Sequence, residues 1–170
     1  MKPTLYLMMG YPGAGKTTIA KLIADLTGAV YLSSDELRFE MFENPQFDAR
    51  EHEALYKELD RRTQQLLEQR KSVVYDANLN RKIHRQEKYT ICENTSAKPL
   101  LIWVKTPKDV AKDRVLSRRS NGLIPKNESA ASMFERITEI IEEPLSDERP
   151  VVIEGIGVDE RRIRQILDLR

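Results

Sequence analysis

The sequence predicts an α/β fold in three layers, a five-stranded parallel sheet with helices on both faces. Short apolar or β-branched runs alternate with longer amphipathic segments along the chain, and the first run, residues 4–9, is almost wholly apolar. Continuous apolar runs are typical of parallel strands buried on both faces, and strand–helix alternation brings such strands into one sheet. No repeat or linker divides the 170 residues, so we expect one domain, 1–170.

The most informative motif follows the first predicted strand. Residues 10–17 read Gly-Tyr-Pro-Gly-Ala-Gly-Lys-Thr, a full G-x-x-x-x-G-K-[ST] phosphate loop, and the apolar spacing after it predicts a helix that ends at Gly28. In such a loop backbone N–H groups surround a polyphosphate, Lys16 reaches the phosphates and the Thr17 hydroxyl binds Mg²⁺. We therefore expect a nucleotide site formed by Gly10, Gly13, Ala14, Gly15, Lys16, Thr17 and Thr18.

The second predicted strand, residues 29–33, leads into Ser34-Asp35-Glu36-Leu37-Arg38. Asp35 and Arg38 are three residues apart and would share one helix face beside the phosphate loop. A carboxylate there can take a proton from an attacking hydroxyl, and an arginine can hold an anionic acceptor. The alternative is an ordinary helix start, capped by Ser34 or Asp35.

The third predicted strand carries a second candidate metal ligand. A helix is expected over residues 50–70, and the strand over 72–75 ends at Asp76-Ala77-Asn78. Ligands of open parallel sheets bind at the carboxyl ends of the strands, where an aspartate can act on Mg²⁺ as a Walker B group. The alternative is that Asp76 is only a turn residue.

The second half of the chain predicts the rest of the sheet and a mobile cover for the site. Arg114 and Arg118 would share a helix face at i, i+4, and Gly122 could act as a hinge, so the segment of about 114–128 is predicted to be a helical lid. The remaining expected elements are helix 81–95, strand 100–104, a helix starting at Pro107, a helix over residues 133–141, strand 151–154 and helix 159–169.

Composition indicates the cellular compartment of the protein and where its positive charge lies. A single cysteine, Cys92, excludes an internal disulfide and fits a reducing cytoplasm, and no apolar run is long enough to span a membrane. The segment 81–126 holds twelve Lys or Arg against four acids, a surplus of 8 in a chain of net charge +1. Such a segment can bind nucleotide phosphates or a nucleic-acid backbone, or it can be solvated helix faces.

Taken together, the phosphate loop, Ser34-Asp35-x-x-Arg38, the strand ending Asp76-Ala77-Asn78, the arginine-rich lid and Pro125 resemble those of P-loop kinases. The resemblance is to the polynucleotide kinase-like group of AAA-type kinases, similar to the 5′-hydroxyl kinase domain of bacteriophage polynucleotide kinase and more distantly to zeta toxins and chloramphenicol phosphotransferase. It covers nearly the whole chain. The phosphate loop is specific to the P-loop superfamily, and the Asp-x-x-Arg pair narrows the resemblance to kinases of this group.

The resemblance implies a role for each candidate residue, with ATP and Mg²⁺ as cofactors. Lys16 and Thr17 become the phosphate and Mg²⁺ groups, Asp35 the general base, Arg38 the clamp on an acceptor phosphate, and Asp76 a second group near the metal or acceptor. The lid arginine matches ambiguously, because spacing from Arg114 selects Arg118 whereas spacing back from Pro125 selects Arg119. Arg118 is slightly favoured.

The expected function is therefore an ATP-dependent kinase that transfers the γ-phosphoryl group to a hydroxyl, most specifically the 5′-OH of a polynucleotide. The guanine-specific string N-K-x-D does not occur in the sequence, which favours ATP over GTP. One alternative is a small-molecule kinase for an antibiotic, sugar or nucleotide-sugar hydroxyl, and another is a non-kinase ATP-binding switch protein. The sequence predicts a cytoplasmic protein without a membrane segment and offers no evidence for a protein partner.

Overall fold

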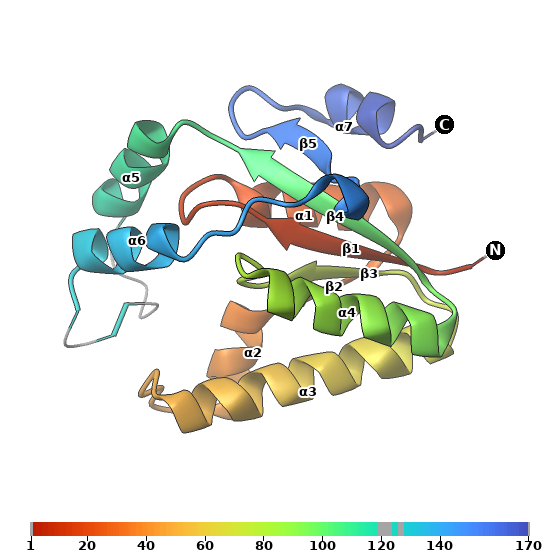
Figure 1. Cartoon of the computed structure of the whole chain (residues 1–170), viewed down its shortest axis with the longest axis horizontal. Helices are drawn as coiled ribbons and strands as arrows, with labels where there is room; N and C mark the ends of the chain where they lie inside the picture. Colours follow the sequence, from red (N-terminus) through yellow and green to blue (C-terminus); the bar gives the residue numbers. More distant parts are fainter. Residues whose placement is uncertain (1, 119–123, 126–127, 170) are drawn as a thin grey trace.

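The computed structural model describes residues 2–118, 124–125 and 128–169, and Figure 1 shows their arrangement. Its five strands form one parallel sheet in the order β2-β3-β1-β4-β5, as predicted. The elements are β1 (Thr4–Met9), α1 (Lys16–Thr27), β2 (Val30–Ser33), α2 (Ser34–Met41), α3 (Ala49–Glu68), β3 (Val73–Asp76), α4 (Lys82–Thr95), β4 (Lys98–Lys105), α5 (Lys108–Ser117), α6 (Ala130–Glu139), a 3₁₀ turn (Ser146–Glu148), β5 (Val151–Glu154) and α7 (Glu160–Ile166).

Two hydrophobic clusters separate the sheet from its helical layers. Leu5 and Leu7 of β1 pack into the cluster shared with α3 and α4, whereas Tyr6 and Met8 pack into the cluster shared with α1 and α7. Successive strand residues point to opposite faces, so the apolar run of β1 fills both clusters at once. The three-layer α/β architecture predicted from the sequence is confirmed.

The parallel sheet sets the position of the site. β1 lies between β3 and β4, with Leu7 opposite Tyr75 and Leu101. Since all strands run the same way, their carboxyl ends lie at one edge of the sheet. This edge carries the phosphate loop after β1, the start of α2 after β2, and Asp76 at the end of β3. Figure 1 shows α5 and α6 beside this edge.

Two predictions about local structure were wrong. The N-cap of α2 is Ser33, whose hydroxyl accepts a hydrogen bond from the Glu36 N–H at 3.4 Å, rather than Ser34 or Asp35. Helix α5 ends at Ser117, and Arg118 is extended (φ −71°, ψ 134°), so Arg118 does not share a helix face with Arg114. The Ser117 hydroxyl donates to the Arg114 carbonyl at 3.2 Å, the acceptor that the next helical N–H would need.

The predicted lid lies partly outside the described residues. Residues 119–123, which include Gly122, and residues 126–127 fall in the undescribed part of the segment 114–128, so the lid stays a prediction. On either side of it, α5 and α6 pack against each other through Ala111, Val115 and Phe134. Within the described ranges, no helix has the length and apolar character needed to cross a membrane.

Candidate active site

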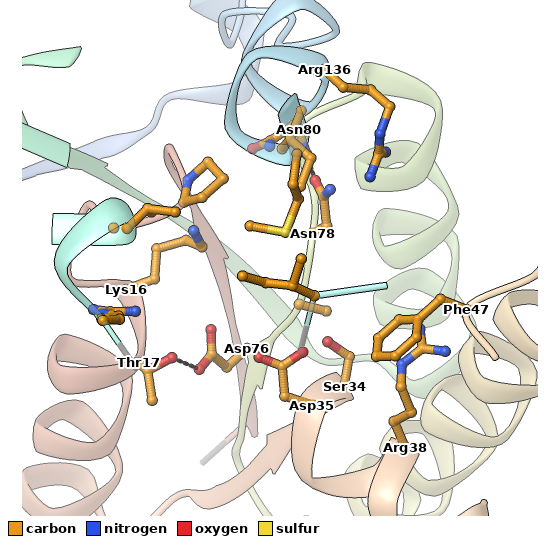
Figure 2. Close-up of a pocket in the computed structure, with 18 of the residues that line it drawn as sticks. Lys16, Thr17, Ser34, Asp35, Arg38, Phe47, Asp76, Asn78, Asn80 and Arg136 are labelled. Carbon is orange, nitrogen blue, oxygen red and sulfur yellow. Dashed lines mark hydrogen bonds between the residues drawn. The ribbon is translucent and has the colours of Figure 1, made fainter. Parts of the chain in front are cut away.

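A cleft of about 400 Å³ opens at the carboxyl edge of the sheet. Its walls come from the phosphate loop, the start of α2, the end of β3 and the α5–α6 region (Figure 2). Among the residues predicted from the sequence, the cleft brings together Gly13, Gly15, Lys16, Thr17, Thr18, Asp35, Arg38, Asp76 and Arg118. Gly10 and Ala14 are not among the residues that line it, and Arg119 is outside the described residues.

The phosphate loop is pressed against the segments that follow β4 and β5. Gly13 has φ 78°, and a Cβ on it would lie 2.2 Å from the Ala111 carbonyl oxygen. The Thr106 hydroxyl donates to the Ala14 carbonyl at 2.9 Å, and a Cβ on Gly155 would lie 2.1 Å from that same oxygen. The loop conformation therefore depends on glycine at close approaches, as a backbone cradle for phosphates requires.

Helix α1 begins at Lys16 and directs its N-terminus at the cleft. The N–H groups of a first helical turn lack helical partners and favour an anion, together with the helix dipole. The Lys16 ammonium folds back on the loop, donating to the carbonyls of Gly10 at 3.0 Å and Tyr11 at 2.9 Å. Burial lowers the Lys16 pKa, and the nearby carboxylates of Asp76 and Asp35 oppose that shift.

Thr17 and Asp76 form a compact oxygen site. The Thr17 hydroxyl donates to Asp76 Oδ2 at 2.7 Å, and the Tyr31 hydroxyl donates to the same oxygen at 2.8 Å. In the described part of the chain, no three His, Cys, Asp or Glu side chains cluster as a metal site. Mg²⁺ commonly binds one or two protein oxygens and completes its shell with water and substrate phosphates, so these residues fit that cation.

Asp35 stands on the first turn of α2 with its carboxyl group facing the cleft, near Asp76 (Figure 2). Asp35 is exposed to the open cleft, where partial desolvation by the cleft walls and the negative charge of Asp76 raise the Asp35 pKa above its ordinary value. Lys16 and Arg38 act in the opposite direction. A raised pKa makes the carboxylate a stronger base, which suits proton removal from a hydroxyl.

Arg38 has a buried partner that the sequence did not reveal. Its guanidinium forms an ion pair with Glu51 of α3, and both residues are 7% exposed. Glu51 Oε2 also accepts the Gln46 N–H at 2.6 Å, which holds the loop before α3 in place. Phe47 in that loop has φ 59°, and its ring lies over the Arg38 guanidinium, whose carbon is 4.6 Å from the ring centroid (Figure 2).

The arginines near the lid have different surroundings. Arg114 donates to the carbonyls of Gly13 at 3.3 Å and Gly155 at 3.2 Å, which ties α5 to the phosphate loop. Arg118 lines the cleft, as its predicted role requires, although it is no longer helical. Arg136 of α6 also reaches the cleft and forms a two-pronged ion pair with Glu128, with both N–O distances 2.8 Å.

The sequence reasoning missed a polar and aromatic wall opposite the phosphate loop. His52 and Tyr56 of α3 lie with ring centroids 4.4 Å apart, and the Tyr56 hydroxyl accepts the Asn78 N–H at 3.2 Å. Asn80 lines the same cleft, and its side-chain oxygen is the one buried side-chain polar atom without a partner among the described residues. The many charges of this helix were most simply interpreted as a solvated face, so the individual residues of this wall were not predicted.

Part of the positive segment 81–126 is already engaged within the described protein. Arg85 pairs with Glu148 at 2.7 Å and Lys88 with Asp60 at 2.5 Å, and both cations are buried. Lys108 and Lys112 both pair with Glu135. Five of its twelve cations, counting Arg114, are therefore engaged by carboxylates or backbone carbonyls, which reduces the surface charge inferred from the sequence.

Comparison with known proteins shows the family and the fold of the chain. A family model described as an AAA domain matches residues 5–144, which is 140 of the 170 residues. The chain belongs to this AAA domain family. A search of curated protein sequences found no significant match.

Three solved structures illustrate the likeness of fold. A sugar kinase from Janibacter sp. has a TM-score of 0.72 at 19% identity, covering 98% of this chain and 95% of the other. The Mycobacterium tuberculosis APS kinase CysC, solved with AMPPNP and APS, has a TM-score of 0.69 at 17% identity, covering 99% and 97%. The Pnkp1/Rnl/Hen1 RNA repair complex has a TM-score of 0.63 at 21% identity, covering 82% of this chain and 46% of that one. At these low identities, the TM-scores show a shared P-loop kinase-like fold.

Proposed function

We propose that this protein is an ATP-dependent phosphotransferase that phosphorylates a hydroxyl group of a small molecule. The observation that carries the proposal is the convergence of Lys16, Thr17 and Asp35 on one cleft. The phosphate loop and Lys16 would hold the nucleotide, while Thr17 and Asp76 would hold Mg²⁺, which neutralises phosphate charge when bound.

The proposed reaction is a single phosphoryl transfer. The acceptor oxygen forms a bond to the γ-phosphorus, the bond from that phosphorus to the leaving oxygen of ADP breaks, and the hydroxyl proton passes to Asp35. The transition state spreads negative charge over the transferred group, so positioning and cationic groups do most of the catalysis. Lys16 and Arg118 line the cleft where that charge would develop.

The size and charge of the cleft support a small acceptor over the polynucleotide favoured by sequence. Its volume of about 400 Å³ is within the usual range of small-molecule sites. A polynucleotide groove requires cations available to phosphates, and five cations of the positive segment are already engaged. The sugar kinase and APS kinase folds are consistent with a small acceptor.

A polynucleotide 5′-hydroxyl is the second candidate. It is supported by the Asp35-x-x-Arg38 spacing and by the likeness of fold to the RNA repair complex. The two candidates differ physically, because added salt screens phosphate contacts and would lower activity steeply on a polynucleotide but little on an uncharged small molecule.

The test follows transfer of label from the γ-phosphate of ATP, with Mg²⁺, to a panel of sugars, antibiotics, nucleotide sugars and a 5′-hydroxyl oligonucleotide. We expect transfer to one small molecule that Asp35→Asn abolishes. Glu36→Gln is the matched control, since Glu36 is the adjacent exposed acid and pairs with Lys21 instead. Slow ATP hydrolysis with no acceptor, unaffected by Asp35→Asn, would instead favour the switch-protein alternative.

A further inference from the structure

The half of the cleft opposite the phosphate loop contains two arginines, and each is already matched by a carboxylate. Arg38 pairs with Glu51, and Arg136 pairs with Glu128. Asp35 faces the same space and has no hydrogen-bond or ion-pair partner within the described residues. The acceptor half therefore has no surplus positive charge and one unmatched carboxyl group.

The Arg38–Glu51 pair is built into the wall rather than lying on the surface. Glu51 is held from three sides, by Arg38, by the Gln46 N–H and by its own N–H, which donates to the Asp48 carboxylate at 2.8 Å. A buried ion pair loses much of its attraction for a third charge, because the partner carboxylate cancels the field of the arginine. An incoming phosphate or carboxylate would also meet repulsion from Asp35 and Glu51.

The pairing leaves Arg38 able to donate hydrogen bonds. One of its terminal nitrogens contacts Glu51, while a guanidinium carries five N–H groups. Asn78 and Asn80 add uncharged amides to the same wall, and Phe47, Tyr56 and Met133 add apolar surface. The wall therefore combines hydrogen-bond donors and acceptors with apolar and aromatic surface. This combination matches an uncharged molecule with several hydroxyl groups and an apolar face.

We propose that Glu51 makes the acceptor half of the cleft selective for an uncharged, hydroxyl-rich acceptor of the carbohydrate type, by neutralising Arg38. This inference rests on the proposed kinase function and specifies its substrate class. It assigns Arg38 the role of a hydrogen-bond donor whose positive charge Glu51 balances, in place of the clamp on an acceptor phosphate that the sequence resemblance implied. Phe47, held over Arg38, would supply part of the apolar face.

The probe is inorganic sulfate, titrated against protein whose phosphate loop is filled with Mg²⁺ and a non-hydrolysable ATP analogue. Binding is followed through the ¹H–¹⁵N signal of Arg38 Nε. We expect no saturable shift in the native protein and a saturable shift in Glu51→Gln, with sulfate affinity roughly tenfold higher or more. Glu58→Gln is the matched control, because Glu58 lies on the same helix, pairs with Arg61 and Arg62, and does not line the cleft.

Saturable sulfate binding at Arg38 of the native protein, as tight as in Glu51→Gln, would overturn the proposal. The titration of the native protein tests the proposal even if Glu51→Gln does not fold. Glu51→Asp keeps the negative charge, so we expect it to exclude sulfate as the native protein does. The acceptor panel separates the two levels of inference. Preference for a sugar phosphate or an oligonucleotide over every uncharged compound would contradict the selectivity but leave the kinase intact, whereas no transfer at all would contradict the kinase and leave the sulfate result interpretable.

Discussion

The Thr17 hydroxyl lies 2.7 Å from Asp76 Oδ2 and joins the phosphate loop to the end of β3, 59 residues away. Both groups are oxygen donors at the expected Mg²⁺ position, so losing the hydroxyl should weaken both metal binding and turnover. For Thr17→Ala we expect a rise in the Mg²⁺ concentration for half-maximal activity and a fall in kcat of about 100-fold, measured by ATP turnover. Thr27→Ala, at the other end of the same helix and outside the cleft, is the control, because its hydroxyl donates to the Ile23 carbonyl at 2.7 Å; equal losses in both would contradict the assignment.

Tyr31 is a positioning residue for Asp76. Its hydroxyl donates to the same carboxylate oxygen at 2.8 Å, and its removal would leave Asp76 freer to turn. Partners of this kind commonly change metal affinity by about 10-fold to 100-fold, so Tyr31→Phe should weaken Mn²⁺ binding by about tenfold. The measurement is Mn²⁺ titration by electron paramagnetic resonance in the absence of turnover. Tyr75→Phe, which loses a hydrogen bond to Asp60 instead, should leave Mn²⁺ affinity unchanged.

Asp35 should link activity and stability to pH. Its folded-state pKa is raised, so the folded state holds the proton more tightly than the unfolded chain, and stability falls as pH rises through the window between the ordinary and the raised pKa. Asp35→Asn mimics the protonated form and should raise the midpoint of thermal unfolding at neutral pH. That gain should vanish below the ordinary aspartate pKa of about 3.9. A lower midpoint for Asp35→Asn at neutral pH would contradict the raised pKa.

Ionisation of Asp35 should also set how kcat/KM falls at acidic pH. As a general base Asp35 must be ionised, so kcat/KM should rise with pH with an apparent pKa above the ordinary aspartate value of about 3.9. The profile of any transfer retained by Asp35→Asn should lack that rise. A native profile that is flat down to the ordinary aspartate pKa would argue against Asp35 as the base.

Arg118 is the candidate for a cation that stabilises the transferred phosphoryl group. It lines the cleft beyond the end of α5, and removing such an arginine finger lowers kcat by roughly 10³-fold to 10⁵-fold. Single-turnover transfer by Arg118→Ala measures this loss, with ATP affinity measured separately. Arg119→Ala tests the alternative from the sequence, and a loss under about tenfold for both variants would rule out a lid arginine in this role.

We expect Gly13 to be essential for nucleotide binding because a side chain there would collide with backbone, which would not happen at Gly28. Both Gly13 and Gly28 have positive φ, 78° and 68°, but only at Gly13 would a Cβ meet backbone, at 2.2 Å, while the space at Gly28 is empty. We expect Gly28→Ala to cost about 1 kcal/mol of stability without affecting ATP affinity. Gly13→Ala should abolish ATP binding in equilibrium titration, and retained binding would show that the loop tolerates displacement.

Sequence alone was sufficient for the sheet and for bringing the phosphate-loop residues and two aspartates to one cleft. Local patterns carry this information: apolar runs define the strands, the glycine spacing defines the loop, and parallel strands bring their carboxyl ends to one edge. Lys16, Thr17, Asp35 and Asp76 were therefore predicted to lie together, and they do line one cleft.

The charge of the acceptor half was decided only by tertiary structure. Arg38 looked like a free cation until Glu51, one of many acids on α3, proved to be its buried partner, and Tyr31 approaches Asp76 across 45 residues of sequence. Arg118 lies outside its predicted helix, which ends at Ser117, where the serine hydroxyl donates to the Arg114 carbonyl. Sequence spacing determines which residues share a strand end or a helix turn, whereas the charge that a ligand meets depends on which side chains from separate elements neutralise one another.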